Sequence, residues 1–403
     1  MRTANAAAGR TMRNSWIAVG LLWLAGVGLR LTILAVPPVI LLIQSDLSLS
    51  GTEVGILSGL PVILFGIAAV PGSLLVARFG ALATLVAGLL IAGVVSGLRG
   101  AILNVAVLYA ATIVMSAGIA IMQPALSPLV RQWLPKRVTF GTAVYTNGLL
   151  VGETLAVMLA IPLVLPLGGG SWRWAFAIWG IPLVMIAILT LALAPAPPKA
   201  ASATPGAGFS WWPDFRNKLI WQVGILFGSV NSVYFSCNAF LPGHLTAAGR
   251  PDLISATLTA LNFGQVPASF ALLAVAGRLE RRALPFIISG ALMLSCLAGI
   301  VSTASGWTVA FAGVLGFLTA VVLTLGFALP PLLSAPAGVA RMSAAMFTIS
   351  YSEALVVAVL SGAAWDSGGS PQFAFLPIAI SALPLLFVPA AIPFHRPHDA
   401  ATL

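Results

Sequence analysis

Long apolar stretches separated by short polar segments run along the whole chain. The segments between them are too short to form a sizeable soluble domain. Because an α-helix needs roughly 20 residues to cross a bilayer, the pattern predicts an all-α integral membrane protein with 12 transmembrane helices. The predicted crossings lie approximately at residues 16–43, 53–77, 81–98, 104–130, 139–167, 174–196, 218–244, 253–277, 283–303, 307–333, 341–363 and 372–394.

The composition agrees with a membrane setting. Hydrophobic residues make up 60% of the chain and charged residues only 7%, whereas roughly 25% of an ordinary soluble domain is charged. The first apolar stretch is too long for the core of a signal peptide and carries Arg30, so we predict a retained helix.

The distribution of basic residues predicts the orientation. With the N-terminus in the cytoplasm, every Lys and Arg except Arg30, Arg99, Arg173 and Arg250 falls on the cytoplasmic side, as the positive-inside rule requires. We therefore expect a multi-pass protein of the bacterial inner membrane with both termini in the cytoplasm. The net charge of +10 is spread over many short loops, so membrane lipid is the expected partner and nucleic acid is not.

A segment rich in Pro, Gly, Ala, Ser and Thr divides the chain near its middle. The predicted parts are an N-terminal tail (1–15), a first six-helix bundle (16–196), a linker (197–217), a second six-helix bundle (218–394) and a C-terminal tail (395–403). The halves show a faint ordered repeat that aligns Arg30 with Tyr234 and Glu153 with Glu353. Such internal symmetry is typical of secondary transporters, although any two apolar segments share Gly, Leu and Val.

Several short motifs are spread over most of the chain. They are LRLT at 29–32, LSGLPV at 57–62, ARFG at 77–80, QPALSPLVRQWLPKRV at 123–138, WQV at 221–223 and NSVYF at 231–235. With these motifs the sequence resembles the major facilitator superfamily, and more narrowly its cyanate and 2-nitroimidazole transporter family. The resemblance implies two pseudo-symmetric six-helix bundles around a central cavity that opens alternately to each side. Ala77 stands where the superfamily's loop signature has an acidic residue, which weakens inference about gating contacts.

Arg30 lies deep in the first apolar stretch. A full charge near the middle of the membrane costs at least ~2.5 kcal/mol, so it needs a partner or a wet cavity. One interpretation is an internal ion pair with Glu153 or Glu353 that only locks helices together. The other is a binding site for a carboxylate-like or other planar anion, because a guanidinium offers forked donors and keeps its charge.

Glu153 and Glu353 are predicted to lie near the same membrane depth as Arg30. A carboxyl group in a poorly hydrated site holds its proton more readily, whereas a nearby arginine favours the charged form. Competition between substrate and carboxylate for Arg30 would couple anion binding to glutamate protonation. Three roles stay open for the glutamates, namely proton coupling, charge balance for Arg30 and contact with the substrate.

Neutral polar residues form a second group of candidates. Asn231, Tyr234 and Asn238 share one face of the seventh predicted helix, and we expect that face to look into the cavity. Further candidates for hydrogen bonds to a small planar substrate are Gln123, Asn147, Asn262, Gln265 and Tyr351. Interhelical hydrogen bonding without substrate contact is the alternative for each of these polar residues.

Signatures of an enzyme are poor. His244, His395 and His398 lie near helix ends or in the tail, and the sequence has no metal-ligand spacing and no phosphate-binding glycine motif beside a lysine. Cys237 and Cys296 fall within apolar stretches and are interpreted as packing residues. We therefore predict a protein that is not an enzyme and has no cofactor and no metal.

The leading hypothesis is a secondary active transporter that moves a small anion or planar weak acid by alternating access, driven by protons. In this hypothesis Arg30 holds the negative group, Tyr234 and Asn231 face it from the other bundle, and Glu153 or Glu353 carries the proton. The alternative is proton-driven export of neutral or cationic aromatic compounds such as nitroimidazoles. A non-transporting receptor is a third class, and a monomer suffices for either kind of transporter.

Overall fold

The computed structural model describes residues 2–102, 104–135, 137–195, 215–279, 281–303, 305–334 and 339–394. Every regular element in these ranges is helical, which confirms the all-α fold class. Most of the predicted linker (197–217) and the whole predicted C-terminal tail (395–403) lie outside the described residues. The helical backbone begins at Arg2, so it runs through the predicted N-terminal tail.

Most predicted crossings appear as long apolar helices. In the described ranges, 10 helical segments are long and apolar enough to span a membrane, or up to 11 if a pair bent by 55°, Gly51–Ile67 and Pro71–Phe79, counts as one span. The predicted crossing at 253–277 is divided at Gly264 into the helices Ile254–Phe263 and Gln265–Leu279. Pro267 has no N–H for the carbonyl four residues earlier, and Gly264 lies against the backbone of Gly313.

The described chain forms two compact units. Unit 1 comprises Met1–Ala35, Ala68–Ala156 and Leu163–Phe209, and unit 2 comprises Val36–Ile67, Val157–Pro162 and Ser210–Leu403. Residues 36–67, which the sequence assigns to the first bundle, thus cluster with the second unit by their contacts. The predicted division into two bundles of six helices stays a prediction.

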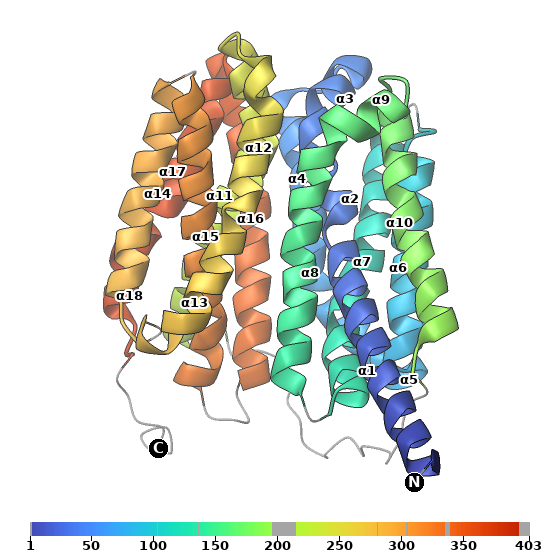
Figure 1. Ribbon diagram of the computed structural model, residues 1–403. Helices are drawn as coiled ribbons and strands as arrows, with labels where there is room; N and C mark the ends of the chain where they lie inside the picture. The colour runs from blue at the N-terminus through green and yellow to red at the C-terminus, as the bar shows by residue number, and fades with distance from the viewer. Residues whose placement is uncertain are drawn as a thin grey trace. The chain divides into compact units, whose positions relative to one another are not determined.

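In unit 1, α6 lies side by side with α7 and α10, as Figure 1 shows. Asn104 begins α7 by accepting a hydrogen bond from the backbone N–H of Ala106 at 2.8 Å, which satisfies a donor of the first turn. A short π-helix, Ala160–Val164, continues α8. The helices of this unit are α1 (Arg2–Gly28), α2 (Leu31–Leu34), α5 (Ala69–Phe79), α6 (Ala81–Arg99), α7 (Val105–Trp133), α8 (Val138–Leu159) up to residue 156, α9 (Leu165–Leu167) and α10 (Trp172–Leu193).

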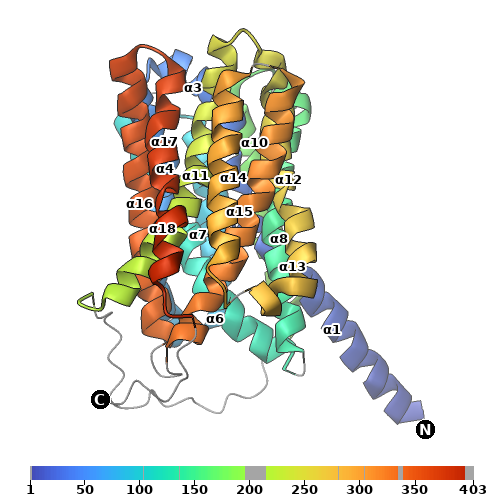
Figure 2. The same cartoon turned by 90° about the vertical axis from the view of Figure 1, so that its left-hand side faces the viewer.

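In unit 2, α16 packs against α4 and α11, and α15 packs against α12 and α14 (Figure 2). Asn217 caps α11, and Ser305 forms a capping box with Thr308 at the start of α15. The elements are η1 (Pro37–Val39), α3 (Ile40–Leu47), α4 (Gly51–Ile67), α11 (Lys218–Ala247), η3 (Pro251–Leu253), α12 (Ile254–Phe263), α13 (Gln265–Leu279), α14 (Leu284–Ser302), α15 (Gly306–Leu333), α16 (Val339–Gly368), η4 (Pro371–Ala374), α17 (Phe375–Ala382) and α18 (Pro384–Ala391).

The first apolar stretch is interrupted where the sequence predicts a continuous helix over 16–43. Helix α1 ends at Gly28, and α2 begins at Leu31 after a turn at Leu29 and Arg30. A second interruption follows at η1, where Pro37 and Pro38 supply no backbone N–H to the preceding turn. Arg30 therefore lies at a break in a membrane helix, where backbone groups depart from regular helical pairing.

Candidate functional site

Arg30 and Glu153 form a buried ion pair in unit 1. The guanidinium Nε lies 3.2 Å from the carboxylate Oε1, and the two side chains are only 12% and 3% exposed. Arg30 is near the middle of the span Ser15–Leu47, and Glu153 is near the middle of the span Phe140–Leu167. The sequence left Glu153 and Glu353 open as ion-pair partners of Arg30, and the structure places Glu153 beside it.

A seam of glycines brings the two charged residues together. Gly26 of α1 lies against the backbone of Tyr145, while Gly148 and Gly152 of α8 lie against the backbones of Trp23 and Val27. Glycine at these positions lets two membrane helices approach until their backbones touch. Glu153 directly follows Gly152, so the close approach of α8 to α1 places its carboxylate beside the break at Arg30.

Replacing Gly148 by alanine is expected to destabilise the protein by about 1 to 3 kcal/mol, because the new methyl group would overlap the carbonyl oxygen of Trp23. Gly20→Ala is the matched control, since a Cβ added at Gly20 of α1 meets nothing within 4 Å. The control should raise stability slightly through helix propensity. Thermal unfolding of the purified proteins measures both effects, and equal melting temperatures for the two variants would contradict the close contact.

The other predicted site residues of unit 1 have different surroundings. Asn147 accepts a hydrogen bond from the indole Nε1 of Trp23 at 3.0 Å, so its side chain joins α8 to α1. This contact matches the interhelical alternative for Asn147. Gln123 is half-buried on α7.

Three polar residues of unit 2 form a connected network. The Tyr234 hydroxyl donates to the side-chain Oδ1 of Asn262, and the side-chain Nδ2 of Asn262 donates to Asn238 Oδ1 at 2.9 Å. Asn238 in turn donates to the backbone oxygen of Tyr234 at 2.9 Å. The structure therefore brings Tyr234 and Asn238 together, as their helical spacing predicts, and joins them to Asn262 of α12, another polar candidate from the sequence.

Asn231 lies in a second polar contact of unit 2, on the side of α11 that meets α16. Its amide donates to Ser350 Oγ at 2.7 Å, and both residues are buried. Glu353 is one turn further along α16, near the middle of the span Met342–Gly368, and its carboxylate rests on the backbone of Gly228. Among the described residues, no basic side chain forms a salt bridge with Glu353.

Tyr351 and Gln265 are both buried in unit 2. Tyr351 stacks on Phe347 with the ring centroids 5.8 Å apart, and it also contacts Phe65 at 5.6 Å. Gln265 begins α13 directly after the break at Gly264. These rings belong to an aromatic cluster that runs from the buried side chains of Phe65, Phe227 and Tyr351 through the half-buried Phe347 to the exposed Phe327.

Comparison with known families decides the class of protein. The profile of the Major Facilitator Superfamily matches residues 21–352, which is most of the chain. The chain belongs to the major facilitator superfamily. It is accordingly a multi-pass membrane transporter and not an enzyme.

Two relatives and two solved structures fit this membership in the major facilitator superfamily. The uncharacterized transporter YycB of Bacillus subtilis (strain 168) is 26% identical over 276 residues, which cover 68% of this chain and 67% of YycB. A 2-nitroimidazole transporter of Escherichia coli (strain K12) is 25% identical over 255 residues, with 62% of each chain covered.

The solved structures share the fold of this major facilitator superfamily chain. A bacterial homolog of the human lysosomal transporter Spinster, inward-facing and unoccupied, has a TM-score of 0.72 at 14% identity, with 94% of this chain and 96% of that chain covered. The nucleoside transporter NupG has a TM-score of 0.71 at 12% identity, with 96% and 99% covered.

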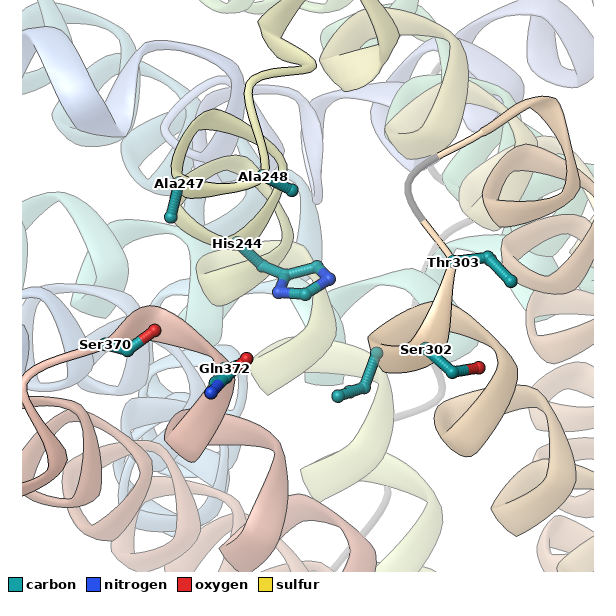
Figure 3. Close-up of a pocket in the computed structure, with 8 residues that line it drawn as sticks. His244, Ala247, Ala248, Ser302, Thr303, Ser370 and Gln372 are labelled. Carbon is teal, nitrogen blue, oxygen red and sulfur yellow. The ribbon is translucent and has the colours of Figure 1, made fainter.

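A polar recess of about 180 Å³ lies at one end of unit 2 in this superfamily member. Figure 3 shows the His244 ring directed into it, with Gln372 and Ser302 on its walls. His244 Nε2 lies 3.2 Å from the carbonyl oxygen of Ile300, which can only accept, so Nε2 carries the hydrogen. None of the eight lining residues is Arg, Lys, Asp or Glu, so this recess does not supply the charge that an anion site needs.

Arg99, which the sequence analysis sets on the non-cytoplasmic side, has buried surroundings that the sequence did not indicate. Arg99 is the last residue of α6 and is fully buried. Its guanidinium lies 4.3 Å from the centre of the Phe176 ring, and its Nη1 is 3.1 Å from Met115 Sδ. A cation at a helix C-terminus and over an aromatic face is stabilised by both. Phe176 is distant in sequence, so no local signal announces the contact.

Proposed function

We propose that the chain is a secondary active transporter of a small anion or planar weak acid, such as cyanate, nitrate or a small carboxylate. The observation that carries this proposal is the buried Arg30–Glu153 pair at the break between α1 and α2. Arg30 lies at a turn between two helices and not within a regular helix. Its guanidinium donors can therefore turn from Glu153 to a planar anion. The proposal places the chain in the cyanate and 2-nitroimidazole transporter family.

The charge content of unit 1 supports exchange between Glu153 and an anion. Within the sequence ranges of this unit, Glu153 is the single acidic residue. When Glu153 leaves Arg30, no other carboxylate of the unit can take its place, and a buried guanidinium without a counter-charge is costly. An incoming anion fills that role, so the pair acts as a gate that admits negative substrates.

Glu353 carries the coupled proton in this proposal, and Glu153 balances the charge of Arg30. Glu353 is half-buried against Gly228 and has neutral polar neighbours in Asn231 and Ser350. A carboxylate without an adjacent cation gains its proton at less cost than one held by arginine. Asn231, Tyr234 and Asn238 contact the substrate, with Gln123, Asn147, Gln265 and Tyr351 as further polar contacts. The transporter works as a monomer in the bacterial inner membrane, with both termini in the cytoplasm.

A second candidate function is proton-driven export of neutral or cationic aromatic compounds. The aromatic cluster of unit 2 favours it, because rings 5 to 6 Å apart offer planar faces. The relative that is named a 2-nitroimidazole transporter favours it as well. In this function Arg30 pairs with Glu153 for structural reasons, and the glutamates meet the substrate.

A thermal-shift screen separates the two functions. The purified protein and Arg30→Ala are heated with cyanate, nitrate, nitrite, small carboxylates and 2-nitroimidazole. A ligand that binds only the folded state stabilises it by about 2.7 kcal/mol at a hundredfold excess over its dissociation constant. The proposal predicts an anion that stabilises the parent and not Arg30→Ala. Stabilisation of both proteins by 2-nitroimidazole alone would favour the aromatic exporter.

A further inference from the structure

Asp366, in the last turn of α16, joins this helix to the first turn of α4. Its Oδ1 accepts a hydrogen bond from the backbone N–H of Gly51 at 2.6 Å. Its Oδ2 accepts from the backbone N–H and the hydroxyl of Thr52, at 2.8 and 2.6 Å. The first N–H groups of a helix have no partners within the helix and carry positive partial charge, so a carboxylate from another helix binds them strongly.

The contact between α4 and α16 continues along the glycines of α4. Gly51 and Gly362 lie backbone to backbone, and Gly55 lies against the backbone of Ala358. Gly59 follows one turn further and is covered by the Leu355 side chain, so the glycines extend over about 12 Å of α4. At Gly55 and Gly362 the two helices touch by backbone atoms, so at these two positions they can part without changing a side-chain rotamer.

The same end of α16 is held to α11 in a different way. Trp365 packs over Gly243 and lies edge to face with Phe240, with the ring centroids 6.2 Å apart. Apolar packing of this kind is retained unless water enters. The polar contact with the start of α4 is instead made by one carboxylate that is exposed to solvent, and the Trp365 side chain also lies close to Gly51. Water can replace the hydrogen bonds of Asp366 when the two helices part, which lowers the cost of separating them at this end.

We propose that Asp366 is a latch, a positioning residue that holds the end of α16 on α4 in one state of the transporter and releases it in another. The proposal rests on the proposed function in one respect, that the protein cycles between two states. Helix α16 also carries Glu353 and Ser350, so the latch sets the position of the helix that bears the coupling carboxylate. The element with two arrangements is the contact between α4 and α16 along these glycines.

Distances between spin labels test the latch directly and need no substrate. The labels are attached at Ser45→Cys, in α3 just before α4, and at Ser367→Cys, in the last turn of α16; both positions are exposed. The native cysteines Cys237 and Cys296 are buried, and their failure to react is checked in the unsubstituted protein. The labelled parent should give one dominant short distance.

Asp366→Ala should add a population at longer distance and change the ratio of the two populations by about tenfold, the loss expected for charged hydrogen bonds. Asp366→Glu keeps a carboxylate and should return the distribution towards that of the parent. Thr52→Val removes one hydroxyl donor, so it should also add a population at longer distance, but a smaller one than Asp366→Ala adds. Asp252→Ala is the matched control, because this exposed carboxylate pairs with Arg250 in the same unit and should change nothing.

A distribution for Asp366→Ala that superimposes on that of the parent would overturn the latch. A variant that fails to fold is recognised by its thermal unfolding, and Thr52→Val then provides the deciding comparison. The outcome is separate from the proposed function: shifted distances in a protein that moves no anion would retain the latch and reject anion transport. Anion uptake that depends on Arg30, together with unshifted distances, would support anion transport and reject the latch.

Discussion

Arg30→Ala is expected to reduce anion uptake about 100-fold or more. Two charge-assisted hydrogen bonds from a guanidinium to an anion contribute about 3 to 6 kcal/mol together, and their loss in the rate-limiting complex corresponds to this factor. Arg30→Lys keeps the charge but loses the forked donors, so it should retain only part of the uptake. Uptake of the candidate anion into cells or proteoliposomes measures the effect, at equal amounts of inserted protein.

A control is needed because Arg30→Ala leaves Glu153 buried without its partner, which is strongly destabilising in itself. The double variant Arg30→Ala/Glu153→Gln removes both charges and should recover thermal stability while uptake stays abolished. Arg78→Ala, an exposed arginine at the end of α5, should transport like the parent. Parent-like uptake by the double variant would remove Arg30 from the mechanism.

Glu353→Gln is expected to abolish the response of uptake to a proton gradient. Glutamine keeps the size and polarity of the side chain but cannot bind and release a proton. Uptake driven by an inward proton gradient should fall to the level seen without a gradient, whereas exchange of internal for external anion should continue. The measurement is uptake by proteoliposomes across a series of external pH values, where the parent takes up more anion as the external pH falls.

Glu153→Gln is the informative comparison for Glu353→Gln. In our account Glu153 competes with the anion for Arg30, so removing its charge should lower the KM for the anion and leave the pH response in place. If Glu153→Gln instead flattened the pH profile and Glu353→Gln did not, the roles of the two glutamates would be exchanged. The pair of variants thus assigns proton coupling and charge balance separately.

The apolar pattern of the sequence was sufficient for the fold class. Hydropathy locates membrane helices because every backbone polar group in lipid must be satisfied within a helix. Arg30, Glu153 and Glu353 each lie near the middle of the span that carries them, as predicted. The superfamily membership expected from the sequence motifs was confirmed by the match over residues 21–352.

Contacts between distant segments could not be predicted in the same way. The sequence left two glutamates, Glu153 and Glu353, as possible partners of Arg30. The close contact between α1 and α8, which their glycines allow, brings Glu153 beside it. Arg99 has a polar, loop-like signature but is covered by Phe176 from another helix. The sequence around Asp366 indicates only a charged residue at a helix end. Its hydrogen-bond donors Gly51 and Thr52 are more than 300 residues away in the sequence.

Helix breaks were the other feature that hydropathy missed. Gly264 and Pro267 interrupt the eighth apolar stretch, and the turn at Leu29 and Arg30 interrupts the first. Both stretches are apolar on either side of the break, so a pattern that averages hydropathy over about 20 residues continues across it. Proline and glycine within a long apolar run are therefore the signals to weigh more heavily when a transporter site is sought in a sequence.

The most direct test of an Arg30-centred anion site is accumulation of the best-stabilising anion in proteoliposomes whose interior is more alkaline than the medium. The account predicts accumulation above equilibrium by the parent protein and none by Arg30→Ala/Glu153→Gln. Equal accumulation by both proteins would contradict it, as would a parent protein that moves 2-nitroimidazole and none of the anions.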